Sequence, residues 1–157
     1  MRAGSALVAV LVAVAATLVA CGGSNRLSAN AYRGKLAAVS REAAAAQGAV
    51  EKGTAHAKSV KDLQAALTDF ANAERHLASI VQGLKPPKDA QSANDELALG
   101  ASDTSKSAGK AVTAVGKFNS VQAAIRYLSS HNGNQKGAHE LGDALAKLKS
   151  LGYTKAG

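Results

Sequence analysis

Apolar residues recur every three or four positions from residue 29 onward, which is the spacing of a helix with one buried face. The first stripe alternates steps of four and three residues, as a heptad does. Its members are Tyr32, Leu36, Val39, Ala43, Ala46 and Val50. The segment from Gly53 to Lys58 interrupts the pattern. We therefore expect a first helix that begins at Ala29 and ends before Gly53.

A second stripe has the same spacing and predicts a second helix. Its apolar members are Leu63, Leu67, Phe70, Leu77, Val81 and Leu84. Ser59 is a suitable N-cap residue, and Asp62 three positions later suits the first turn. The helix should end at Lys85, because Pro86 and Pro87 follow and proline restricts the residue before it.

The third stripe is the longest and starts directly after the two prolines. It comprises Ala90, Ala93, Leu97, Ala101, Thr104, Ala108, Ala111, Val115 and Phe118. Proline is tolerated in a first helical turn, so Pro87 can open this helix. At Asn119-Ser120 the helix either kinks or breaks, and an apolar face then continues as far as Ser130.

A turn at His131–Asn134 precedes a last helix from about Gln135 to Ser150. We expect Ala138, Leu141, Leu145 and Leu148 to point inward and Gly152 to follow as the C′ residue. No run alternates with a period of two for long enough to indicate a strand. The pattern therefore predicts an all-α fold, an antiparallel up-down four-helix bundle with a long third helix that is kinked or broken near Asn119.

The N-terminal segment has a different character. Arg2 precedes an apolar run from Ala6 to Ala20, which is typical of a secretory signal peptide. The run is shorter than the roughly 20 residues that a membrane-spanning helix needs. The segment Leu18–Cys21 resembles the lipobox of bacterial lipoproteins, in which the cysteine is lipidated and becomes the first mature residue. An ordinary signal peptide that leaves a free cysteine is the alternative.

These observations divide the chain into four parts. Residues 1–20 form the cleaved signal peptide, residues 21–28 the lipidated Cys21 and a flexible tether, residues 29–152 the helical bundle, and residues 153–157 a C-terminal tail. We expect the protein to be anchored to the cell membrane at its extracytoplasmic face. Two acyl chains at Cys21 would hold it stably, where a single chain gives only marginal binding.

Composition and charge add two expectations. Alanine is the commonest residue and Trp is absent, so the core should be helical and thin. The chain carries a net charge of +8, and removal of Arg2 with the signal peptide leaves +7. The candidate basic surface consists of Lys106, Lys110, Lys117, Lys147 and Lys149. It would face anionic lipid or a wall polymer, or it is simply solvated. Nucleic acid is not an expected partner of an exported protein.

Candidate catalytic and metal-binding patterns are weak. The nearest approach to a metal site is His139 with Asp143, and this pair lacks the second histidine of a His-Glu-x-x-His motif. Serine-hydrolase elbows and nucleotide-binding loops are absent from the sequence. We therefore expect neither an enzyme nor a cofactor. Glu74 alone breaks the apolar pattern, and it either turns to the rim of the bundle or serves as a polar contact inside a small ligand pocket.

The segment Gly83–Ala90, with its Leu-Lys-Pro-Pro sequence, and the following Asn94–Leu97 carry a second resemblance. They resemble small uncharacterised lipoproteins and secreted helical proteins of high-GC Gram-positive bacteria, in which a Leu-x-Pro-Pro hinge joins two long helices. A histidine often stands in those proteins where this chain has Asn94. The resemblance implies a helical bundle and an extracytoplasmic location, and it implies no activity.

The sequence thus favours a membrane-anchored, non-catalytic binding or accessory module, with another envelope protein as a candidate partner. The alternative is a small carrier that holds an apolar ligand between its helices. An enclosed apolar cavity of a few hundred Å³ would favour the carrier, and a collapsed alanine-packed core would count against it. An envelope enzyme ranks lowest.

Overall fold

The computed structural model describes residues 25–131 and 135–154. These residues form an all-helical fold of five α-helices and one short 3-10 turn. The elements, in chain order, are α1 (Ala29–Ala55), α2 (Val60–Gly83), the turn η1 (Lys88–Ala90), α3 (Gln91–Val115), α4 (Val121–Ser130) and α5 (Gln135–Ser150). The predicted signal peptide and Cys21 lie outside the described residues.

Helix ends follow the local chemistry of the sequence. Ser59 caps α2, because its side chain accepts a hydrogen bond from the amide of Asp62 while the Asp62 carboxylate accepts one from the amide of Ser59. Interaction of the Asp62 carboxylate with the Ser59 side chain, and hydrogen bonds that it accepts from the backbone amides of Lys58 and Ser59, lower the pKa of Asp62. Gly152 has φ +75 after the last turn of α5. The predicted N-cap and the predicted C′ glycine are both confirmed.

Four predicted helix boundaries need correction. Helix α2 ends at Gly83 and not at Lys85. Helix α3 begins at Gln91 and not at Pro87, because a 3-10 turn comes first. Helix α1 continues past Gly53 to Ala55, so the interruption is limited to residues 56–59. The long third helix breaks after Val115, and α4 starts anew at Val121 with the Ser120 side chain accepting a hydrogen bond from Ala123. The break, and not the kink, is what the sequence around Asn119 produces.

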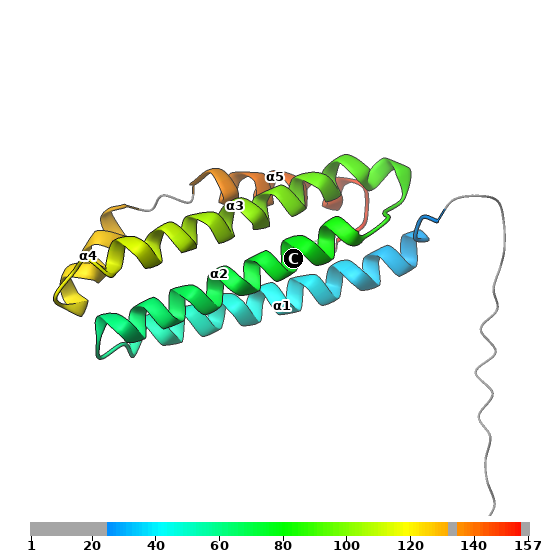
Figure 1. Ribbon diagram of the computed structural model, residues 1–157. Helices are drawn as coiled ribbons and strands as arrows, with labels where there is room; N and C mark the ends of the chain where they lie inside the picture. The colour runs from blue at the N-terminus through cyan, green and yellow to red at the C-terminus, as the bar shows by residue number, and fades with distance from the viewer. Residues whose placement is uncertain (1–24, 132–134, 155–157) are drawn as a thin grey trace, which may run out of the picture.

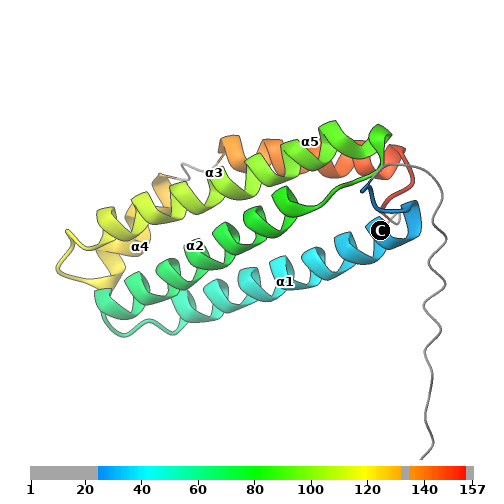
Figure 2. The ribbon, with the colours of Figure 1, turned by 45° about the vertical axis from the view of Figure 1, so that its right-hand side comes forward.

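The long helices lie side by side, and each packs mainly against one or two neighbours (Figures 1 and 2). Helix α2 packs against α1 on one side and α3 on the other, and α3 also packs against α5. Helix α4 extends beyond the end of α5 and makes small contacts with α2 and α3. Extensive packing is thus confined to neighbours in the order α1, α2, α3, α5. Helices α1 and α5 stand at the two edges of this arrangement.

The core has two apolar clusters, one toward each end of the helices. The first cluster is centred on Tyr32, Leu97 and Leu148, and the second on Leu63 and Val115. The predicted stripes of α1, α2 and α3 supply most of these side chains. In α5 the buried apolar side chains are Ala144 and Leu148. Leu145 is 46% exposed, so the expectation that Leu145 is buried is wrong. Ala138 is also exposed, so the expectation that it points inward is wrong too.

The segments that flank the helices also belong to the folded domain. Arg26 donates a hydrogen bond to the Pro86 carbonyl at 2.8 Å, and the Leu27 amide donates one to the Lys85 carbonyl at 2.7 Å. Tyr153 is buried against Tyr32. The segment expected to be a flexible tether is therefore held from Arg26 onward, and the expected tail begins with a core residue.

Candidate functional site

An apolar cleft of about 450 Å³ lies between α1 and α5, with α2 and α3 as its floor. Its side chains come from all four helices and from the residue after Tyr153. The lining residues are Leu36, Val39, Ser40, Ala43, Glu74, Leu77, Val81, Leu97, Ala101, Leu141, Leu145, Ala146, Lys149 and Thr154. This volume lies within the range of small-molecule sites, about 300–1,000 Å³.

The cleft exists because α5 is drawn toward α3 and not toward α1. Gly100 allows a close approach, since a Cβ built there would lie 2.8 Å from Leu141 Cγ and 2.9 Å from the Leu141 backbone nitrogen. Lys147 Nζ lies 2.7 Å from Glu96 Oε2 and links the same two helices. With α5 fixed on α3 and α1 fixed on α2, the space between α1 and α5 stays open.

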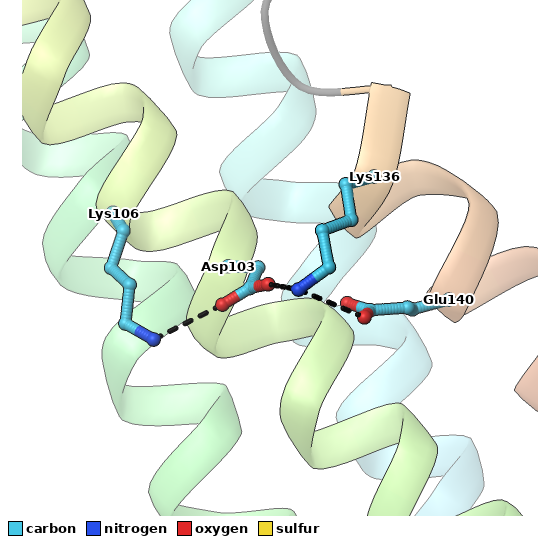
Figure 3. A network of polar contacts seen from close by, with 4 residues as sticks. All are labelled: Asp103, Lys106, Lys136 and Glu140. Atoms are coloured by element: carbon cyan, nitrogen blue, oxygen red, sulfur yellow. Dashed lines mark hydrogen bonds and ion pairs between the residues drawn. The ribbon is translucent and has the colours of Figure 1, made fainter.

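A chain of charges across α3 and α5 adds to this contact (Figure 3). Asp103 lies between Lys106 on its own helix, at 3.0 Å, and Lys136 on α5, at 2.7 Å. Lys136 also lies 3.4 Å from Glu140. Hydrogen bonds from the two lysines, led by Lys136, lower the pKa of Asp103, and the bond to Asp103 raises the pKa of Lys136.

Two tyrosine rings pack in the core cluster that also contains the cleft residues Leu36, Val81 and Leu97. The rings of Tyr32 and Tyr153 meet edge to face with their centroids 5.2 Å apart. The Tyr32 hydroxyl donates to Asn94 Oδ1 at 3.1 Å, and Asn94 Nδ2 donates to the Val81 carbonyl at 3.0 Å. Burial, with smaller effects of Tyr153 and Asp95, raises the pKa of Tyr32 to about 12. Asn94 is therefore a buried structural residue that ties α1, α2 and α3 together.

Glu74 is the most unusual side chain of the cleft. It is only 7% exposed, so the expectation that it turns to the rim is wrong. Within residues 25–131 and 135–154 it has neither a hydrogen-bond partner nor an ion-pair partner. Burial raises its pKa. An unpaired buried carboxylate is costly for the fold, which is a cost typical of functional positions.

A second cavity, of about 780 Å³, lies on the other side of Glu74 along the same helices. Phe70 and Thr104 border it at positions one helical turn from Glu74 and Ala101, and α4 contributes Tyr127. The basic residues that line it, Lys110 and His131, are exposed. This cavity lacks a buried charge of the kind that Glu74 supplies to the cleft, as far as the described residues show.

The expected basic surface is divided among several environments. Lys106 and Lys147 form ion pairs with Asp103 and Glu96. Lys110 lines the second cavity and Lys149 lines the cleft. Lys117 lies exposed in the connection between α3 and α4. Two of the five lysines are thus partly neutralised within the domain.

Three general observations complete the description of the site. Comparisons with protein-family models, with curated proteins and with solved structures find no match for this chain. No helix among the described residues has the length and apolar character that crossing a membrane requires. The described residues also contain no group of three or more His, Cys, Asp or Glu side chains arranged to hold a metal ion.

Sequence reasoning identified Glu74 as an exception and offered a ligand pocket around it as one of two alternatives, but it did not predict the residues that line the cleft. Ala43, Ala101 and Ala146 line the cleft, and their short side chains leave the space open. The sequence did indicate that Glu74 lies on the apolar face of α2, because it falls in register with the apolar residues of that helix. The signal that was missing is the role of Gly100, which depends on a contact with Leu141, 41 positions away.

Proposed function

We propose that this protein is a non-catalytic binding protein that holds a small, largely apolar ligand in the cleft between α1 and α5. The observation that carries the proposal is an apolar cavity of about 450 Å³ into which one buried, unpaired carboxylate is built. Ligand sites generally combine an apolar lining with a few placed polar groups. Of the two roles that the sequence left open, this geometry supports the carrier better than the accessory module.

The proposal includes the arrangement of the bundle. Short connections between successive helices favour an antiparallel, up-down order, in which α4 and α5 together take the place of a fourth helix. In this arrangement the ligand lies in the gap between the first and the last helix. Along the cleft α1 packs on α2 and α5 packs on α3. The two helices can therefore move apart there to admit a ligand, while the Tyr32–Tyr153 contact and the bond from Arg33 to the Gly152 carbonyl hold one end together.

The proposal also retains the membrane anchor at Cys21. Arg26 and Leu27 are held at the end of the bundle where Tyr32 packs against Tyr153. Five residues from Cys21 to Asn25 reach about 17 Å at full extension, so this end would face the bilayer. Mass spectrometry of the native protein should find a diacylglycerol-modified Cys21 at its amino terminus. An unmodified cysteine, or full membrane partitioning of a Cys21→Ala variant, would contradict the anchor.

Equilibrium binding of a neutral apolar fluorescent probe, N-phenyl-1-naphthylamine, tests the carrier role. Ala43 lines the cleft from α1, whereas Ala45 is exposed on the same helix. An Ala43→Leu variant should therefore bind the probe at least about fivefold more weakly, since the larger side chain fills the cleft, while an Ala45→Leu variant should bind like the wild type. Equal affinity of both variants, or no binding by the wild type, would refute the proposal.

A further inference from the structure

From the chemistry of the cleft we infer that its ligand is a cationic amphiphile, an amine whose charged group pairs with Glu74 and whose apolar chain lies among the leucines. This inference rests on the proposed function and names the class of ligand. It starts from the polar side chains that line the cleft, which are few. Ser40 and Thr154 are neutral, and Glu74 and Lys149 carry opposite charges.

The two charged side chains differ in burial. Lys149 lines the cleft but is exposed to solvent. Glu74 is 7% exposed and lies outside ion-pair distance of any described cation. Its neighbours along α2, Arg75 and His76, are exposed, and Arg75 donates a hydrogen bond to Asn72. The unpaired charge inside the cleft is therefore negative, and a positively charged group would complement it.

The apolar part of the ligand has a defined place. Leu77 and Val81 follow Glu74 on the same face of α2, and Leu36 and Leu97 face them from α1 and α3. The seven helical steps from Glu74 to Val81 span about 10 Å along the helix axis. Val81 packs in the same core cluster as Tyr32 and Tyr153. A chain of medium length, with its amine at Glu74 and its end near the tyrosines, fits this space.

A positively charged ligand would also offset the free-energy cost of burying the Glu74 carboxylate. Burial raises the pKa of Glu74, because the carboxylate loses water and gains no counter-ion. A bound ammonium group donates charge-assisted hydrogen bonds to the carboxylate, and such bonds are roughly twice as strong as neutral ones. An alcohol of the same length gains only a neutral bond, and a carboxylate of the same length is repelled.

Isothermal titration of the full-length protein with octylamine, octanol and octanoate at pH 7 tests this inference. Octylamine should bind wild-type protein at least about tenfold more tightly than octanol, and octanoate should bind most weakly. Glu74→Gln should abolish this preference by weakening octylamine about tenfold while octanol binds as before. The matched control is Asp69→Asn, which removes one exposed carboxylate from the same helix and should leave all three affinities unchanged.

The outcomes separate the two proposals. If octanol binds and octylamine binds no more tightly, the amine assignment is wrong and the carrier role stands. If octanoate binds most tightly, the amine assignment is likewise overturned. If none of the three compounds binds the wild type and N-phenyl-1-naphthylamine does not bind either, the carrier role and the amine assignment both fail.

Discussion

Replacement of Gly100 by alanine probes the contact that holds α5 on α3. The new Cβ would lie 2.8 Å from Leu141 Cγ and 2.9 Å from the Leu141 backbone nitrogen. A new rotamer of Leu141 could relieve the clash with its Cγ but not the clash with its backbone nitrogen. Relief of the second clash requires a shift of the whole of α5. Such overpacking costs about 1–3 kcal/mol, against a gain in helix propensity of up to about 1 kcal/mol. We therefore expect Gly100→Ala to destabilise the fold by about 1–2 kcal/mol.

The matched control is Gly109→Ala in the same helix. A Cβ at Gly109 meets nothing within 4 Å, so only the gain in helix propensity remains. This variant should be about 0.5–1 kcal/mol more stable than the wild type. The two substitutions are chemically identical and lie two to three turns apart, yet they should change stability in opposite directions.

Urea unfolding followed by circular dichroism measures both effects. The midpoints should move in opposite directions with unchanged slopes, and the two melting temperatures should separate by several degrees. If both variants gain the same stability, the close approach of α3 and α5 at Gly100 is wrong. In that case the explanation of the open cleft fails with it.

Three further predictions concern stability. Ser59→Ala removes the acceptor of the Asp62 amide and should cost about 1 kcal/mol in urea unfolding; an unchanged midpoint would argue against the cap. Asn94→Leu leaves the buried Tyr32 hydroxyl unpaired and should cost about 1–3 kcal/mol, a cost that adding Tyr32→Phe should partly relieve; strict additivity of the two changes would refute the bond. Because burial raises the pKa of Glu74, its ionisation weakens the fold as pH rises through that pKa. Glu74→Gln should therefore be more stable than the wild type at pH 7 and nearly equal to it below about pH 4; a gap that is constant with pH would contradict the burial of an unpaired carboxylate.

Local chemistry explains which parts of the fold the sequence could predict. The cap at Ser59, the glycine at position 152 and the proline pair between α2 and α3 act through neighbours in the chain, and each lies where it was expected. The break before α4 had a local signal too, because Ser120 is a good N-cap residue. The heptad pattern outweighed that signal, since it continues on both sides of the break.

Long-range contacts account for what the sequence left open. The pattern placed Glu74 on the buried face of α2, but its environment depends on how far α1 lies from α5. That distance follows from Gly100, which admits Leu141, and from the Lys147–Glu96 ion pair. The same contacts rotate α5 so that Ala144, and not Leu145, enters the core. Hydrophobic periodicity and helix propensity carry no information about such contacts between residues of different helices.

The central claim is that a ligand occupies the cleft between α1 and α5. Nuclear Overhauser effects between octylamine and leucine methyl groups test it most directly. The account predicts contacts from the alkyl chain to Leu36, Leu77 and Leu141, and none to Leu63, which is buried in the other core cluster. Contacts to Leu63 instead, or to no methyl group of the cleft, would contradict the account.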